Sequence, residues 1–169
     1  MNELKATIIK LLDERPIPVD VIVQQLAGAA KRADPDDLAV LERLSRLDDV
    51  MDQLLAVPAL ALLPAWGLSG LNIVIDQAFN GPHRTSAFSV LGVIAQGRCP
   101  TPKDALFLRE DQKACFEYAV PDELSVEALR GIRAGMLECI ADPMAMSTLI
   151  SSIASLGIFP VDTDGHTSP

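Results

Sequence analysis

The sequence predicts an all-α protein, with a single compact helical domain of about seven helices over residues 1–160. Residues 161–169 are predicted to form a disordered tail. Aromatic residues are only 4% of the 169 residues, while Ala, Leu, Ile and Val are abundant. Small and medium aliphatic side chains suit packed helices better than a β-sandwich. Apolar residues also recur at helical spacing, and proline or glycine separates the periodic segments.

The first part of the domain, residues 1–56, is predicted to be an amphipathic helical arm. Apolar residues at helical spacing predict a first helix over residues 2–14. Pro16 and Pro18 follow it, and proline lacks the amide hydrogen that a helix interior needs. A second helix is predicted over residues 19–32. No basic helix follows that could read DNA, so we do not interpret this pair as a winged helix.

Asp34 and Pro35 predict the start of a third helix, because aspartate caps helices and proline fits the first helical position. Its leucines stay in register as far as Leu55, which predicts an amphipathic helix of about five turns. The opposite face carries three aspartates that lack the loop and turn glycine of calcium sites. We interpret them as a solvated face that is also a candidate surface for a basic partner: Asp48, Asp49 and Asp52.

Residues 57–97 are predicted to be the apolar central helices. Residues 54–75 carry no charge, so this stretch must be hidden from water in a protein core or in a bilayer. Predicted breaks near Pro58 and Pro64, with a helix over residues 69–79, divide the stretch into short pieces. This division favours a buried core element over a membrane span.

The motif Asn80-Gly81-Pro82 predicts a tight turn between two helices. Asn80 or Gly81 is expected to take a left-handed cap conformation, and Pro82 is expected to start the next helix. That helix is predicted over residues 83–96.

The C-terminal part of the domain, residues 103–158, is predicted to be helical as well. Asp142 and Pro143 are expected to break its periodic pattern, and Gly157 is expected to end it. Three helices are predicted, over residues 103–119, 121–140 and 144–156.

Residues 84–95 resemble the second helix of a HEAT or armadillo-like repeat, including an arginine, Arg84, at the start. Residues 70–97 also look like residues 131–157, although the second piece has no arginine at the matching position. The resemblance covers about a third of the chain and implies a short stacked solenoid whose concave face binds another protein. One constant separation relates three apolar pairs: Phe88 and Ile150, Leu91 and Ile153, and Ile94 and Leu156.

The overall charge and the cysteines narrow the function classes. A net charge of −9 argues against binding to nucleic acid, where each phosphate contact needs a cation. The three cysteines are widely spaced and form no C-x-x-C motif, which favours free thiols in a reducing compartment. The N-terminus has no signal-peptide pattern. We therefore expect a cytoplasmic protein.

The sequence contains no recognisable catalytic, nucleotide-binding or metal-binding motif, so we expect no enzyme activity, cofactor or metal site. His83 and Arg84, at a predicted helix start near Asn80, form the strongest candidate polar site. The simpler interpretation is a capped turn with a surface ion pair between Asp76 and Arg84.

Three function classes remain open. The chain is predicted to be a non-catalytic helical interaction or scaffold protein that binds a protein partner, or a second copy, through an aliphatic groove. One alternative is a membrane-active protein that masks an apolar hairpin, residues 54–96, in its core. The other is an acidic inhibitor or immunity-type protein that presents carboxylates to a basic target.

Overall fold

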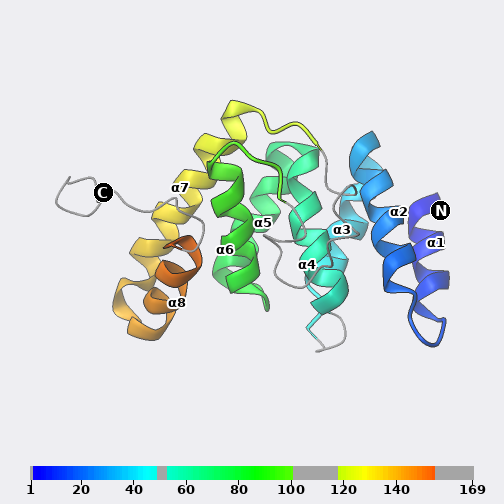
Figure 1. Cartoon of the computed structure of the whole chain (residues 1–169), viewed down its shortest axis with the longest axis horizontal. Helices are drawn as coiled ribbons and strands as arrows, with labels where there is room; N and C mark the ends of the chain where they lie inside the picture. Colours follow the sequence, from blue (N-terminus) through cyan, green and yellow to red (C-terminus); the bar gives the residue numbers. More distant parts are fainter. Residues whose placement is uncertain (1, 49–52, 101–117, 155–169) are drawn as a thin grey trace.

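The helices of this protein pair along the chain. The computed structural model describes residues 2–48, 53–100 and 118–154, and within these ranges it has eight α-helices and no strand (Figure 1). The predicted all-α class is therefore confirmed. The helices are α1 (Glu3–Leu12), α2 (Val19–Arg32), α3 (Leu38–Ser45), α4 (Gln53–Leu62), α5 (Leu68–Asn80), α6 (Arg84–Ala95), α7 (Asp122–Glu138) and α8 (Pro143–Ala154).

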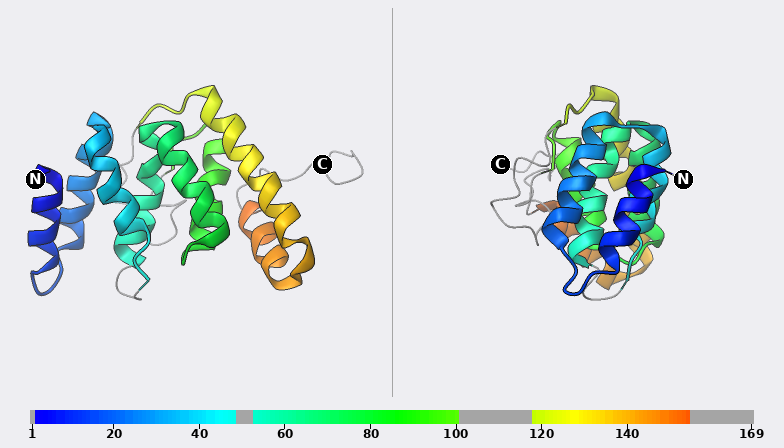
Figure 2. Two further views of the ribbon diagram at one scale, coloured as in Figure 1. Left: turned by 180° about the vertical axis from the view of Figure 1, so that it is seen from behind. Right: turned by 90° about the vertical axis from the view of Figure 1, so that its right-hand side faces the viewer.

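The helices form two connected layers. Each odd-numbered helix packs against the even-numbered helix that follows it, which gives four consecutive pairs. The even-numbered helices also contact one another in succession, from α2 to α4, α6 and α8. Figure 2 shows the pairs following one another along the long axis, with α1 at one end and α7 and α8 at the other. The fold is therefore a row of helix pairs that share one hydrophobic core.

The ends of the first helices lie where the sequence signals predict them. α1 begins after Asn2, whose side-chain oxygen accepts a hydrogen bond from the backbone N–H of Lys5 at 3.0 Å. α2 has the predicted bounds. Asp34 is a cap as predicted, since its carboxylate accepts the backbone N–H of Asp36 at 3.0 Å. The helix that it starts is a single 3₁₀ turn, which leads into α3.

The predicted five-turn helix over residues 34–55 is wrong, because α3 ends at Ser45 and α4 begins at Gln53. The two helices pack against each other, so the leucines of both enter the same core. A single straight helix would carry its second half away from that core. Near the break, the backbone carbonyl of Leu47 accepts a hydrogen bond from Nε2 of His83. The hydrophobic register predicted the inward face of both helices but not the reversal between them.

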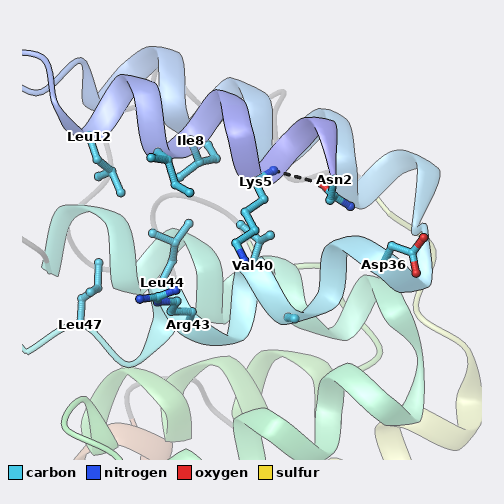
Figure 3. Close-up of a pocket in the computed structure, with 11 residues that line it drawn as sticks. Asn2, Lys5, Ile8, Leu12, Asp36, Val40, Arg43, Leu44 and Leu47 are labelled. Carbon is cyan, nitrogen blue, oxygen red and sulfur yellow. Dashed lines mark hydrogen bonds between the residues drawn. The ribbon is translucent and has the colours of Figure 1, made fainter.

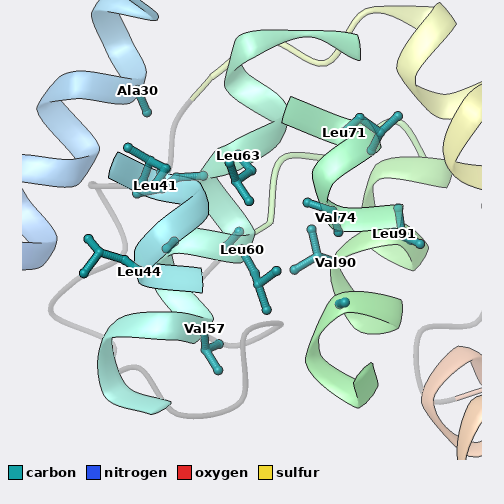
Figure 4. Close-up of a cluster of buried hydrophobic side chains, with 14 of the residues drawn as sticks. Ala30, Leu41, Leu44, Val57, Leu60, Leu63, Leu71, Val74, Val90 and Leu91 are labelled. Atoms are coloured by element: carbon teal, nitrogen blue, oxygen red, sulfur yellow. The ribbon is translucent and has the colours of Figure 1, made fainter. Parts of the chain in front are cut away.

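The apolar stretch lies in the core. Every residue from Leu55 to Pro64 is buried. Figure 4 shows buried side chains from neighbouring helices gathered in this core, among them Leu41 of α3, Leu60 of α4 and Leu91 of α6. None of the described helices is long and apolar enough to cross a membrane. Burial of aliphatic surface is the main force that holds these pairs together.

Only one of the two predicted proline breaks is present. Pro58 lies inside α4, so the predicted break there is wrong. Buried residues surround it on both sides, and their packing outweighs the backbone hydrogen bond that proline cannot make. The chain does leave the α-helix at Pro64, through a 3₁₀ turn (Leu63–Trp66). Gly67, with φ 73°, then redirects the backbone into α5, which matches the predicted range of 69–79 to within one residue at each end.

The predicted turn between α5 and α6 is present, but the predicted left-handed cap is wrong. Asn80 is the last residue of α5, and Gly81 has an extended backbone with φ −88° and ψ 171°. Gly81 is needed because Gln77 leaves no room for a side chain at this position. A Cβ atom at this position would lie 2.8 Å from both Cβ and the carbonyl oxygen of Gln77, which is fully buried. α6 agrees with the predicted helix to within one residue at each end.

The C-terminal pair also follows the sequence signals. α7 continues into a 3₁₀ turn (Cys139–Ala141), and the predicted break comes at Asp142, whose carboxylate accepts the backbone N–H groups of Met144 and Ala145. Gly135 lets α7 approach the edge-to-face pair of Phe79 and Phe88. Three predictions lie outside the described residues: the helix over 103–119, the helix end at Gly157, and the disordered tail over 161–169.

Tyr118 joins the segment before α7 to the centre of the row. Its hydroxyl donates a hydrogen bond to the carbonyl oxygen of Ala61, in α4, at 2.6 Å. Burial raises the pKa of Tyr118 well above its ordinary value of 10.0, with a smaller contribution from the nearby Cys99 thiol. The neutral phenol is therefore bound into the core.

The phenol should make stability fall at alkaline pH. Above pH 10.0 the unfolded tyrosine loses its proton while the folded one keeps it, so unfolding becomes more favourable as pH rises. Because the chain has a single tyrosine, tyrosinate absorbance should show a delayed titration that becomes ordinary in denaturant. Tyr118→Phe should cost about 1–3 kcal/mol at neutral pH, since it leaves the Ala61 carbonyl without a partner. A tyrosinate titration near pH 10.0 in the folded protein would contradict this account.

Candidate functional site

A groove runs between α1 and α3 on the odd-numbered side of the row. Its volume is about 620 Å³. Figure 3 shows Ile8 and Leu12 of α1 facing Val40 and Leu44 of α3, and Leu47 just after α3, across the groove. The lining is mostly aliphatic and consists of eleven residues: Asn2, Lys5, Ile8, Ile9, Leu12, Asp36, Ala39, Val40, Arg43, Leu44 and Leu47.

α1 packs more closely on α2 than on α3, which leaves the groove between α1 and α3. Leu4 and Ile8 of α1 are buried in the core. The side-chain amide of Asn2 donates a hydrogen bond to the carboxylate of Asp37 at 2.7 Å, which ties the start of α1 to the start of α3. Ile9, which lines the groove, remains 47% exposed. The exposed part of the Ile9 side chain is therefore available for contact with a ligand.

Cationic side chains flank this aliphatic surface. Lys5 extends from α1 toward α3, and Arg43 projects from α3, in a chain whose net charge is −9 (Figure 3). Within the described ranges, no ion pair involves either of them. Asp36 lies near one end of the groove. The groove therefore offers apolar surface together with positive charge, which suits a ligand with aliphatic groups and carboxylates.

The groove lining is poor in groups that do acid–base or nucleophilic chemistry. It has no cysteine, serine, threonine or histidine, and its three ionisable residues are Lys5, Asp36 and Arg43. In the part of the chain that the structure describes, no three histidine, cysteine or acidic residues are placed to hold a metal ion.

The structure uses the predicted polar site, His83 and Arg84, as internal links between helices. His83 is only 8% exposed and contacts the carbonyl of Leu47 near the end of α3. Nε of Arg84 donates to the carbonyl of Ala78, in the last turn of α5, at 2.9 Å. A second donor of Arg84 reaches Sγ of Cys139 at 3.6 Å. These contacts join α6 to α3, α5 and the turn after α7.

The predicted ion pair between Asp76 and Arg84 is wrong. Asp76 instead accepts a hydrogen bond from Arg46 at 3.0 Å and another from Asn80 at 3.1 Å. The Arg46 guanidinium, and then the Asn80 amide, lower the pKa of Asp76. Arg84 points elsewhere because the last turn of a helix leaves carbonyls to be satisfied, and Ala78 offers one.

The predicted aspartate surface is only partly described. Asp48 is exposed just after α3. Asp49 and Asp52 lie outside the described residues, so the structure does not bring the three carboxylates together.

The groove is a site that the sequence reasoning missed. The predicted inward face of the first helix held Leu4, Ile8, Leu11 and Leu12, and it left Ile9 unassigned. An isoleucine on the outer face of an amphipathic helix is the signal that could have revealed a second apolar surface. The opposing wall on α3 could not be inferred, because it depends on how the first two pairs stack.

Comparisons with known proteins give no relative. No family model matches the chain, no curated protein matches it, and no solved structure matches it. The comparisons detect no repeat either.

Proposed function

We propose that this chain is a non-catalytic helical interaction protein that binds a protein partner in the groove between α1 and α3. The observation that carries the proposal is the groove itself, an aliphatic surface with an exposed isoleucine, Ile9, and two cations free of ion pairs among the described residues, Lys5 and Arg43. Apolar grooves with a polar rim are common interaction sites in soluble proteins.

The chemistry of the groove favours an amphipathic helix as the bound segment. A gap between two helices accepts a third helix that lays its apolar face into it, with anchors at helical spacing. Ile9, Leu12 and Val40, which are exposed or half-buried, would contact the aliphatic face of such a ligand. Lys5 and Arg43 would pair with carboxylates on its flanks, which would fix its direction and speed its association.

We also propose that the row of pairs is a short HEAT-like solenoid. The alternation of odd and even helices, with each even helix contacting the next, supports this architecture. α6, which carries the predicted repeat-like segment, and α8, its predicted counterpart, occupy equivalent second places in their pairs and contact each other. Extended surfaces between stacked repeats are the usual binding sites of such scaffolds.

Two synthetic peptides test the groove. Each is an amphipathic helix of about 15 residues with leucine at helical spacing, and the polar face carries glutamate in one and lysine in the other. By isothermal titration calorimetry, the acidic peptide should bind the full chain at least about tenfold more tightly than the basic one.

A double substitution should remove this preference. Ala39→Glu/Arg43→Glu changes two exposed groove residues and should abolish binding of the acidic peptide. Arg133→Glu/Ala134→Glu makes the same replacements at exposed positions of α7 and should leave binding unchanged. Equal binding to both double variants would overturn the proposal. Tight binding of the basic peptide, lost steeply with salt, would favour the acidic inhibitor class instead.

A further inference from the structure

A second pocket lies where α5 ends, α6 begins and α7 ends. Its volume is about 450 Å³, which is in the range of pockets that hold small molecules. Its walls are Phe79 and Asn80 of α5, Arg84 of α6, and Ala134 and Glu138 of α7. None of these residues lines the groove between α1 and α3. The pocket therefore combines a cation, an anion and an aromatic side chain from three helices.

Contacts with a backbone carbonyl and with a sulfur atom hold Arg84 in place. Its Nε–H donates to the carbonyl of Ala78 at 2.9 Å, and another of its nitrogen atoms reaches Sγ of Cys139 at 3.6 Å. A guanidinium group has five N–H donors, so these two contacts leave three for a ligand. Among the described residues, no carboxylate lies within ion-pair distance of Arg84. The pocket thus presents an anchored positive charge that pairs with no anion of the described ranges.

Glu138 brings a negative charge to the same pocket. It is exposed and is the last residue of α7, where the helix dipole disfavours a carboxylate. In the ranges that the structure describes, it forms no ion pair with Arg84 or with any other cation. Asn80 adds a second acceptor, because its amide N–H donates to Asp76 at 3.1 Å and leaves the amide oxygen for another partner. A cation bound beside Glu138 would therefore relieve an unfavourable charge.

A ligand with a single charge does not suit this pocket. A simple anion would be attracted by Arg84 and repelled by Glu138, and a simple cation would meet the reverse. A small molecule that carries both a carboxylate and an ammonium group can neutralise both side chains at once. Phe79, which is half-buried, and Ala134 offer apolar surface to the rest of such a molecule. These are the features of a free amino acid with an apolar side chain.

We propose that the pocket between α5, α6 and α7 binds a free amino acid. The carboxylate of the ligand pairs with Arg84, and its ammonium group pairs with Glu138 and contacts the amide oxygen of Asn80. The apolar side chain of the ligand packs against Phe79 and Ala134. This site is separate from the groove between α1 and α3, so neither proposal depends on the other.

NMR titration of the isotopically labelled full chain with each standard L-amino acid tests the proposal. At least one with an apolar side chain should bind with a dissociation constant below about 10 mM. Its deaminated and decarboxylated analogues (for leucine, isocaproate and isoamylamine) should bind at least about tenfold more weakly, since each loses one charge pair. If no amino acid binds at about 10 mM, the proposal is overturned. An analogue that binds as tightly as its amino acid would overturn it too, because the pocket would then recognise a single charge.

Substitutions at exposed positions of the pocket locate the site. Glu138→Gln removes the carboxylate and keeps the shape, while Ala134→Leu fills the pocket, and each should weaken binding at least about tenfold. Glu123→Gln makes the same charge change in the first turn of α7, away from the pocket, and should leave binding unchanged. Circular dichroism checks that all three variants are folded. Unchanged binding in either pocket variant would contradict the proposal, as would an equal loss in Glu123→Gln.

Discussion

Replacing Gly70 with alanine is expected to lower the free energy of unfolding by at least about 3 kcal/mol, or to prevent folding. Gly70 lies in the first turn of α5, where the backbone passes directly over the preceding 3₁₀ turn. An added Cβ atom would lie 1.7 Å from the carbonyl oxygen of Leu63 and 2.7 Å from its carbon. Backbone atoms cannot rotate away as a flexible side chain does, so α5 would have to shift from its place in the core.

Gly28→Ala is the matched control and should raise, rather than lower, the free energy of unfolding. Gly28 lies inside α2, and an added Cβ atom would make only an ordinary contact, 3.6 Å from the Arg32 side chain. Alanine there should stabilise the helix by about 0.5–1 kcal/mol, because glycine loses more backbone entropy on folding. Urea unfolding followed by circular dichroism measures both. Equal effects of the two substitutions would contradict the close packing of α5 on the turn before it.

Leu60→Ala is expected to cost about 2–5 kcal/mol. Leu60 is fully buried in the last turn of α4, and Figure 4 shows it among side chains from neighbouring helices. The substitution removes apolar contacts and leaves a cavity that close-packed neighbours cannot fill. If the apolar stretch forms the core, Leu60→Ala must lower the free energy of unfolding of the protein in water, without lipid.

Leu68→Ala serves as the control for that loss. Leu68 is 39% exposed at the start of α5, so its truncation should change the free energy of unfolding by less than about 1 kcal/mol. Thermal or urea unfolding of both variants gives the comparison. If Leu60→Ala changed the free energy of unfolding as little as Leu68→Ala, α4 would not be a core helix in solution. The membrane-active alternative would then be favoured.

Local signals predicted much of the fold. The bounds of α2 were predicted to the residue, because Pro18 before it and the end of its apolar period leave one reading. α5 and α6 were predicted to within one residue at each end. Gly67 precedes α5, and the motif Asn80-Gly81-Pro82 separates α5 from α6. Proline and glycine mark these helix ends because their effects on the backbone are local.

Tertiary packing decided the elements that were predicted wrongly. The leucines from Leu38 to Leu55 fit one helical period, yet the chain reverses within that range so that both halves reach one core. Pro58 stays helical because burial on all sides outweighs its missing hydrogen bond. Arg84 turns to the end of α5 rather than to Asp76. In the first two cases packing against helices distant in sequence determined the outcome, whereas Arg84 found its partner, the Ala78 carbonyl, six residues earlier in the chain.

The candidate site could be predicted least of all. Its two walls come from different helix pairs, and only their stacking brings Leu12 of α1 to face Leu44 of α3 and places Lys5 and Arg43 along one groove. Periodicity identifies which face of a helix is buried, but it does not identify which second helix leaves a gap beside it. The most informative local signal was the single isoleucine outside the predicted apolar face.

The most direct test of the account is a selection from a displayed library of random helical peptides, with the full chain as bait. The account predicts enriched peptides with aliphatic residues at helical spacing and flanking aspartate or glutamate. They should bind the wild type and Arg133→Glu/Ala134→Glu, but not Ala39→Glu/Arg43→Glu. Enriched peptides that bind all three proteins equally would contradict it, because the groove between α1 and α3 would then not be the binding site.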